Sequence, residues 1–287
     1  MKDYLSLIKF SHTIFALPFA LVGFFLGLEV DSLNPIWPLL LKVIVCMIFA
    51  RSAAMSFNRY VDRRQDELNP RTSSREIPQG VVPPVNALTF TIVNAILFMG
   101  TTYLINPLCF YLSPVALAIT LGYSYTKRFT FLCHLILGLG LSLAPIGAYL
   151  AVTARFDWIP ILFGSAVLFW VAGFDIIYSL QDEIFDRREN LRSIPVWVGS
   201  KTALQISKGL HVICAVLIIC SLLLSHQLFA SLQGLHWIGG GLFLLSLIYQ
   251  HRLVKYDDLS KLNLAFFTTN GMASVIFAFF FIVDLLW

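Results

Sequence analysis

The chain has 287 residues, of which 58% are apolar and only 13% are charged, and its net charge is +4. A soluble domain carries about 25% charged residues, so this composition excludes an ordinary soluble protein. Sparse charge combined with apolar runs of about 18 residues or more indicates a polytopic helical membrane protein. No connecting segment is long enough to bury a core of its own, so we expect one transmembrane domain over residues 1–287.

Nine apolar segments follow one another along the chain. Each is long enough, or nearly so, for a hydrocarbon layer about 30 Å thick at about 1.5 Å per residue. Their approximate bounds are 10–28, 36–58, 84–105, 107–123, 131–151, 158–181, 208–230, 235–250 and 264–286. The sequence therefore predicts an all-α fold of nine transmembrane helices around a central cavity.

Lys and Arg residues are distributed unevenly between these segments. They gather at the N-terminus and in the connections after the second, fourth, sixth and eighth segments. The opposite connections hold only Arg155, with Lys42 near the outer end of the second segment. Because basic loops stay in the cytoplasm, we expect the N-terminus there and Trp287 on the opposite side.

The second segment ends in a row of polar side chains. At about 100° per residue, Asn58, Asp62 and Asp66 share an arc of about 80° on one helix face. Arg51, seven residues before Asn58, falls within about 20° of the same stripe. One face of this helix is therefore expected to be polar from mid-membrane to the cytoplasmic end.

The sixth segment repeats this arrangement with Asp175, Tyr178, Asp182 and Asp186, which also share an arc of about 80°. Both rows lie at the cytoplasmic ends of segments four apart, and arginines follow both. This placement indicates an internal duplication with one site shared between the two halves.

Carboxylates at this spacing need a nearby cation. Two of them about 6 Å apart repel by roughly 2–3 kcal/mol at an effective dielectric of about 20, and helix C-termini disfavour negative charge further. Oxygen ligands suit Mg²⁺, which commonly bridges a few carboxylates to substrate phosphates, and arginine forks match phosphate oxygens. The alternative, solvated loop charges, explains one such row better than two matched ones.

The two rows resemble the paired motifs of the UbiA superfamily of intramembrane aromatic prenyltransferases. The first family motif, NxxxDxxxD, is present as "NRYVDRRQD", and the second, DxxxD with a Tyr four residues earlier, as "YSLQDEIFD". "NPRTSSREIPQG" and "YSYTKR" resemble the family's basic loop and its Tyr-and-Lys/Arg segment, although Glu76 replaces the Pro of many relatives. The resemblance covers nearly the whole chain and implies nine transmembrane helices.

Two further stretches, "IKFSHTIFALPFAL" and "ARSAAMSFNRY", look most like the 4-hydroxybenzoate polyprenyltransferase-like branch. Within that branch they resemble menaquinone-pathway members that work with futalosine-route intermediates. The resemblance implies Mg²⁺-dependent transfer of a polyprenyl group from an allylic diphosphate to an aromatic acid in quinone biosynthesis. The acceptor would be 4-hydroxybenzoate-like or a futalosine-route intermediate.

By the same resemblance, individual residues take roles at the site. The implied metal ligands are Asn58, Asp62, Asp66, Asp182 and Asp186. The candidates for diphosphate contact are Arg71, Arg75, Lys127, Arg128 and Arg192, for each of which a purely topological role is the alternative. The candidates for acceptor binding are Arg51, Asp175, Tyr178, Tyr123 and His12.

Arg51 and His12 each allow two interpretations. A charge as deep as Arg51 costs at least about 2.5–3.5 kcal/mol if unpaired at mid-membrane. Arg51 therefore binds the acceptor carboxylate or forms a salt bridge with Asp175, which otherwise orients the acceptor ring together with Tyr178. His12 either lines the acceptor pocket or is a satisfied interfacial histidine.

Two other functions stay open. One is another UbiA-type branch that prenylates naphthoate, haem or chlorophyll precursors. The other, from a different class, is a cation transporter, because intramembrane Asp residues also mark ion paths. Transport is less favoured because the acids lie at one membrane face among arginines. The expected partners are a polyprenyl diphosphate, a small aromatic acceptor and membrane lipid, with no nucleic acid, and the expected location is a bacterial inner membrane.

Overall fold

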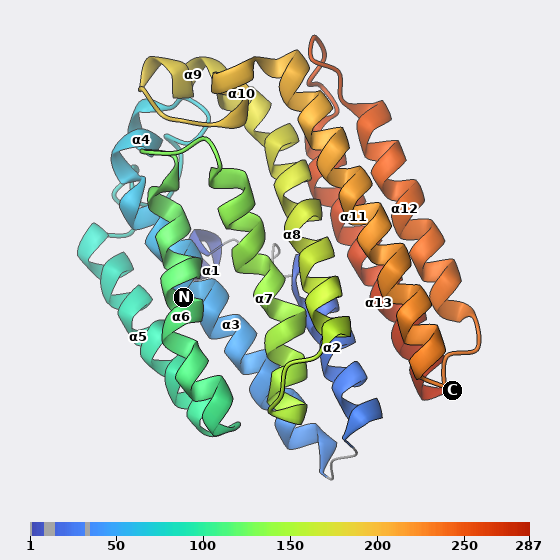
Figure 1. The fold of residues 1–287 in the computed structure, drawn as a ribbon. Helices are drawn as coiled ribbons and strands as arrows, with labels where there is room; N and C mark the ends of the chain where they lie inside the picture. Colours follow the sequence, from blue (N-terminus) through green and yellow to red (C-terminus); the bar gives the residue numbers. More distant parts are fainter. Residues whose placement is uncertain (1, 9–14, 32–34) are drawn as a thin grey trace.

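The structure is a computed structural model that describes residues 2–8, 15–31 and 35–287. Within these ranges there is no β-strand, and long helices run alongside one another in a bundle (Figure 1). The predicted all-α fold is confirmed. The short helices α4, α9 and α10 lie together at one end of the bundle, which we call the polar end, and the C-terminus lies at the other (Figure 1).

The helices follow the predicted apolar segments closely. Their bounds are α1 Lys2–Leu7, α2 Leu17–Val30, α3 Ile36–Val61, α4 Arg63–Leu68, α5 Pro84–Tyr103, α6 Pro107–Thr126, α7 Cys133–Thr153, α8 Trp158–Ser179, α9 Glu183–Arg188, α10 Ile194–Val198, α11 Ser200–Leu228, α12 Leu235–Leu253 and α13 Asn270–Leu286. A π-helical turn, Leu264–Thr269, leads into α13.

Seven helical stretches among the described residues are long and apolar enough to cross a membrane. They do not include α2, whose 14 residues make it a shorter apolar helix, or α12, which carries His236, Gln250, His251 and Arg252. Nine helices therefore match the nine predicted segments in position, while the number of membrane crossings remains a prediction.

The centre of the bundle is α8, because 61% of its most apolar stretch is buried, against 22% for α5 and 17% for α6. Small residues let its neighbour approach closely. An added Cβ at Gly138 of α7 would lie 2.3 Å from the Leu168 carbonyl oxygen of α8. Trp170 and Phe163 of α8 are fully buried. The Phe163 ring lies 6.0 Å from the Phe277 ring of α13, and Trp170 donates to Asn270 of α13 at 3.0 Å, so the buried core joins these two helices. The centre is therefore rigid enough to hold side chains at the polar end.

Both acidic rows cross a break in their helix, which the sequence did not predict. The first helix, α3, ends at Val61, and Asp62 leaves the helical conformation at φ −90° and ψ 8° before α4 begins. The second row crosses a 3₁₀ turn, Leu180–Asp182, between α8 and α9. Backbone bonds from Asp62 to Asn58 (2.9 Å) and from Asp66 to Asp62 (2.8 Å) keep the four-residue spacing of the first row through its break.

Candidate active site

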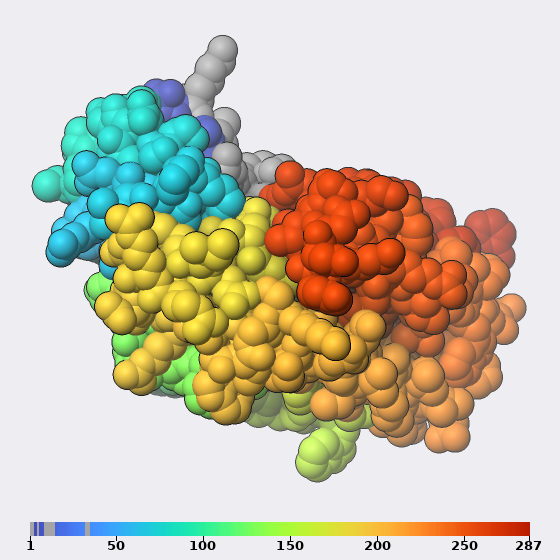
Figure 2. Space-filling view, turned by 90° about the horizontal axis from the view of Figure 1, so that it is seen from above, coloured from blue at the N-terminus to red at the C-terminus, as the bar shows by residue number. Residues whose placement is uncertain are grey.

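The two acidic rows open into one cavity of about 680 Å³ at the polar end. Seen from this end, the chain after α3 (cyan) and the chain after α8 (yellow) lie side by side (Figure 2). The cavity brings together nearly all residues that the sequence singled out: Arg51, Asn58, Asp62, Asp66, Arg71, Arg75, Tyr123, Lys127, Arg128, Asp175, Tyr178, Asp182 and Asp186. The two rows therefore share one site in space.

Each of the four carboxylates in the DxxxD parts of the two acidic rows faces a different basic side chain. The pairs, with the distance between the closest nitrogen and oxygen, are Arg71–Asp182 at 2.6 Å, Arg75–Asp66 at 2.6 Å, Lys127–Asp186 at 3.2 Å and Arg128–Asp62 at 3.6 Å. The Arg71 contact is a fork, because its Nε also donates to the other carboxylate oxygen of Asp182 at 2.9 Å. The repulsion expected between the acids is thus offset by the protein's own cations.

The acids and their partners differ in exposure. Side chains of Asp66, Asp182 and Asp186 are only 7%, 9% and 3% exposed, whereas those of their basic partners are 22–36% exposed. The carboxylates are fixed by the helix ends, and long flexible side chains reach them from loops. The basic groups can therefore change partner without unfolding a helix.

The electrostatics of the site follow from this pairing. Burial raises the pKa of the Asp62 carboxyl to about 6, and repulsion from Asp66 adds to the rise. Burial by itself lowers the pKa of the Lys127 ammonium, but the combined attraction of Asp186 and the other nearby acidic groups outweighs burial, so this pKa is raised. The pKa of the Arg71 guanidinium is likewise raised, because its hydrogen bond to Asp182 and the attraction of the nearby acids together outweigh the effect of burial. Lys127 and Arg71 thus carry full positive charge.

The donor set fits a hard cation that is shared with phosphate. Among the described residues, no three side chains of His, Cys, Asp or Glu converge closely enough to hold a metal ion alone. Mg²⁺ is usually held by one or two carboxylates together with substrate phosphates, so paired acids suit it better than a closed cage would. Within the described ranges, the buried Oδ2 of Asp66 has no hydrogen-bond partner, which leaves an anionic oxygen to receive a cation.

The salt bridge between Arg51 and Asp175 that the sequence allowed is not formed. Asp175 instead pairs with Nδ1 of His134 at 2.7 Å, and His134 is fully buried. The Nε of Arg51 is buried without a hydrogen-bond partner in the described part of the chain. Arg51 and Tyr123 line the polar cavity and also a second, mainly apolar cavity that continues from it and is described below. An unpaired guanidinium at this junction is suited to an anionic ligand.

The structure does not bring every candidate into the cavity. The side chain of Arg192 donates to the carbonyl of Phe129 at 2.7 Å, and its backbone N–H donates to the carbonyl of Lys127 at 2.6 Å. Arg192 thus holds the segment that carries Lys127. His12 lies outside the described residues. Glu76, the departure in the basic loop, accepts a hydrogen bond from Ser6 and ties that loop to α1.

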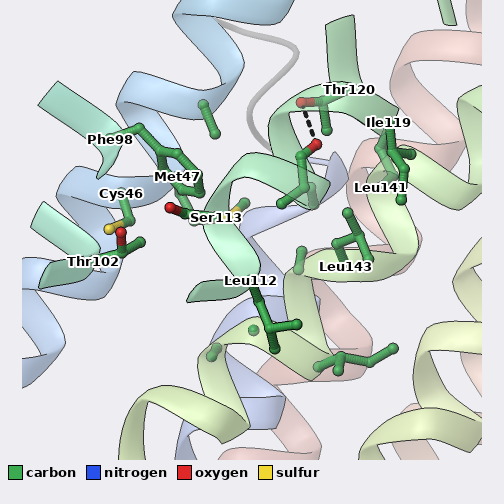
Figure 3. A pocket seen from close by; sticks show the side chains of 18 of the residues that line it. Cys46, Met47, Phe98, Thr102, Leu112, Ser113, Ile119, Thr120, Leu141 and Leu143 are labelled. Carbon is green, nitrogen blue, oxygen red and sulfur yellow. Dashed lines mark hydrogen bonds between the residues drawn. The ribbon is translucent and has the colours of Figure 1, made fainter. Parts of the chain in front are cut away.

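A second cavity, of about 280 Å³, continues from the first among α3, α5, α6 and α7. Its walls are mainly apolar, as Met47, Phe98 and Leu112 show, with Ser113 and Thr120 as isolated hydroxyls (Figure 3). Thr120 donates its hydroxyl to the carbonyl of Ala116 at 2.8 Å, so it adds no free donor. This cavity suits a flexible hydrocarbon chain.

Comparison with known proteins decides the family. The UbiA prenyltransferase family matches residues 16–280 of the chain. The chain belongs to this family. It is similar to the 4-hydroxybenzoate octaprenyltransferase of Aeromonas hydrophila, with 29% identity over 88% of this chain and 86% of the relative. The corresponding enzyme of Tolumonas auensis is also 29% identical, over 85% of this chain and 83% of its own length.

Solved structures agree with this assignment. The apo structure of a UbiA homologue from Aeropyrum pernix has 31% identity and a TM-score of 0.84, covering 96% of this chain and 98% of its own. A UbiA homologue from Archaeoglobus fulgidus, bound to GPP and Mg²⁺, shares the fold with a TM-score of 0.75 at 21% identity, over 99% and 100% of the two chains. The chain is therefore a UbiA-family prenyltransferase and an integral membrane protein.

Sequence reasoning missed several residues of this UbiA-family site. Asn69 donates to Asp182 at 3.1 Å across the two halves, and only its place in the basic loop hinted at a role. His134 was one of several scattered histidines, and nothing in the sequence pairs it with Asp175. Phe266 and Phe267 line the cavity from the far C-terminal segment, where they are two of 25 phenylalanines.

Proposed function

We propose that this protein transfers a polyprenyl group from an allylic diphosphate to an aromatic acid with the help of Mg²⁺. The observation that supports this most is the set of four acid–base pairs at the mouth of a polar cavity that leads into an apolar one. The acids are suited to the cation, the bases to the diphosphate, and the apolar cavity to the prenyl chain.

Substrate binding would exchange the partners of these pairs. The carboxylates of Asp62, Asp66, Asp182 and Asp186, with the amide of Asn58, would hold Mg²⁺, whose charge stabilises the departing diphosphate. Arg71, Arg75, Lys127 and Arg128 would turn from their acids toward the phosphate oxygens, which charge-assisted bonds favour. The exchange keeps every charge paired, so it needs little reorganisation of the backbone.

Arg51 supports an acidic acceptor. Its unpaired guanidinium lies seven residues, about 10 Å along the helix, below Asn58, which is deeper than a diphosphate held by the acidic rows would extend. A bidentate bond to a carboxylate would satisfy it. The ring of that acceptor would then lie between Arg51 and the diphosphate, beside Asp175 and Tyr178.

The relatives support the same reaction class. The similar proteins are 4-hydroxybenzoate octaprenyltransferases, and solved homologues were bound to GPP or DMAPP with Mg²⁺. The branch of the family that uses futalosine-route acceptors remains compatible, since both kinds of acceptor carry a carboxylate for Arg51. The uneven placement of basic residues supports an inner-membrane orientation with the polar end and the N-terminus in the cytoplasm.

A transfer assay tests the proposal. Purified protein in liposomes would receive radiolabelled geranyl or octaprenyl diphosphate with 4-hydroxybenzoate, and we expect a prenylated aromatic acid with Mg²⁺ but not with EDTA. Asp182→Asn should remove the activity, while Asp31→Asn, an acid paired with Arg155 and 39% exposed outside the site, should not. Cation flux without transfer would favour a transporter, and prenylation of a naphthoate alone would favour another UbiA-type branch.

A further inference from the structure

The chain enters its last helix through a π-helical turn, Leu264–Thr269, that borders the polar cavity. A π-helical turn closes its backbone hydrogen bonds over five residues instead of four, is rare, and is frequent at functional sites. Side-chain donors to the carbonyls of such a turn add to its backbone bonds and favour it over the regular α-helix.

Asn270 supplies two of these donors. Its side-chain amide donates to the carbonyls of Phe266 at 2.9 Å and of Ala265 at 3.3 Å. Its own carbonyl oxygen accepts from the indole N–H of Trp170 at 3.0 Å, which fixes which way the amide points. Trp170 is fully buried and Asn270 is 1% exposed, so water does not replace either bond.

Two further side chains complete the set. The amide of Gln250, on α12, donates to the carbonyl of Ala265 at 3.0 Å, and Gln250 is fully buried. The hydroxyl of Thr269 donates to the carbonyl of Leu264 at 3.1 Å. Buried polar side chains of α12 and α13 therefore donate directly to the turn, and Trp170 of α8 orients one of them, Asn270. The donors of this network are all used, whereas the buried side-chain oxygen of Gln250 has no hydrogen-bond partner among the described residues.

The turn determines where two aromatic rings lie. Phe266 and Phe267 lie within the π-helical turn, so its backbone sets the direction of both side chains, and both line the polar cavity. Their rings meet edge to face with centroids 4.6 Å apart. Phe266 also stacks on Tyr178, with centroids 4.1 Å apart. We call Tyr178, Phe266 and Phe267 the aromatic wall.

The aromatic wall begins beside the acidic rows. The guanidinium of Arg71 lies over the ring of Tyr178 at 5.4 Å and donates to its hydroxyl at 3.2 Å, while it also pairs with Asp182. One ring of the wall therefore already faces a cation. A positive charge that develops next to the diphosphate would meet the same wall, because aromatic faces attract cations.

We infer that Asn270, Gln250 and Trp170 are positioning residues for the transfer reaction, since they hold the π-helical turn that presents the aromatic wall to the allylic cation. This inference rests on the proposed function. In that reaction the allylic C–O bond breaks and its electron pair leaves with the diphosphate. A ring carbon of the acceptor then forms the new C–C bond with its π electrons, and the ring proton passes to the diphosphate.

Water competes with the acceptor for the same cation. If water adds instead, its oxygen forms the new bond, its proton passes to solvent, and the product is a free prenol. The aromatic wall disfavours this outcome by covering the cation and by excluding water from it. If the turn relaxed to α-helical geometry, both rings would change direction relative to the cavity, and the aromatic wall would be disrupted. The ratio of prenol to prenylated acid therefore reports on the turn.

The test compares four single variants in the transfer assay with Mg²⁺, radiolabelled geranyl diphosphate and 4-hydroxybenzoate. Gln250→Met and Asn270→Leu remove the amide donors at nearly unchanged side-chain size. Ser207→Ala is the matched control, because Ser207 is fully buried and donates to the carbonyl of Gly173 at 2.7 Å, away from the turn. Product ratios are measured per mole of folded protein.

We expect the prenol share to rise about fivefold or more in Gln250→Met and Asn270→Leu, as the loss of a cation–aromatic contact would produce. The KM for geranyl diphosphate should change less than about twofold, since the acidic rows are intact. Phe266→Leu should raise the prenol share in the same way. Amide hydrogen exchange over 264–269 should quicken in the first two variants and stay unchanged in Ser207→Ala.

Equal prenol shares in all variants and the control, with activity falling only as folded protein is lost, would overturn the inference and leave the proposed function intact. Wild-type protein that neither transfers nor hydrolyses geranyl diphosphate would overturn the proposed function itself. Faster exchange in the turn without a change in product ratio would show that the network has a structural role only, which also contradicts the inference.

Discussion

Replacing Arg71 by alanine separates the resting role of the acid–base pairs from their role with substrate. Arg71 forms a two-bond fork with Asp182, whose side chain is only 9% exposed. Stranding a buried carboxylate costs about 3–5 kcal/mol. Arg71 is itself 31% exposed, and Asn69 still donates to Asp182 at 3.1 Å, so we expect a smaller loss of about 2 kcal/mol.

Thermal unfolding in detergent measures this loss. A cost of about 2 kcal/mol corresponds to a fall in Tm of about 4–8 °C for a chain of this size class. If Asp182 is a metal ligand, Mg²⁺ with inorganic pyrophosphate should recover more than half of this fall in Tm, because a new cation replaces the lost guanidinium. Asp182→Asn should start near the wild-type Tm and gain little from the same addition.

The matched control is Arg187→Ala, which breaks an exposed pair with Glu183 at 3.1 Å, 59% exposed on the arginine side. Exposed pairs of this kind contribute about 0.3–0.5 kcal/mol, and Mg²⁺ should not change that small loss. The reasoning is refuted if Arg71→Ala loses several degrees of Tm in EDTA and recovers none with Mg²⁺ and pyrophosphate.

Three further outcomes are expected. Arg51→Lys should raise the KM of the acceptor about tenfold, since lysine lacks the planar fork, and a changed KM of the prenyl diphosphate alone would contradict the acceptor role. Because the folded pKa of Asp62 is about 6, above its ordinary 3.8, Mg²⁺ affinity by titration calorimetry should fall as pH drops below about 6. In EDTA, the contribution of Asp62 to stability should be fully present below 3.8 and be lost as pH rises through about 6, as a comparison with Asp62→Asn measures. A flat affinity from pH 7 to 5 would exclude Asp62 as a ligand. Ser113→Trp, which fills the apolar cavity, should slow transfer from octaprenyl diphosphate much more than from geranyl diphosphate, and an equal effect on both would place the chain elsewhere.

Much of the fold and of the site could be predicted because helical periodicity and the placement of charged residues are visible in short stretches of sequence. The four-residue spacing of Asp62 and Asp66 fixed a shared direction, and the hydrogen bonds that keep it survive the helix break. The choice of partner for each acid depends instead on contacts between distant parts of the chain, as when Arg71 reaches Asp182. The pairing of His134 with Asp175 depends on how α7 packs against α8, which a single sequence does not encode as a pattern.

From the sequence we inferred that the clustered acids need a cation and that this cation is Mg²⁺. The need for positive charge is real, but Mg²⁺ is not its only source. The structure shows that arginine and lysine side chains meet the same need. Sequence reasoning treated the acids and the bases as ligands of different partners, so it did not pair them with each other. Arg192, which the same reasoning placed at the phosphate, holds a loop instead.

The basic loop between α4 and α5 has one property that reaches beyond the reaction. Two of its arginines, four residues apart, pair with different acidic rows: Arg75 pairs with Asp66 of the first row, and Arg71 pairs with Asp182 of the second. The loop thus connects the two acidic rows at the polar end and supplies the basic side chains that neutralise one acid of each row. If turnover requires Mg²⁺, as proposed, a shortage of the ion would stop turnover while the acid–base pairs still neutralise the acids. The folded protein would then regain activity when the ion returns, with no need for new synthesis.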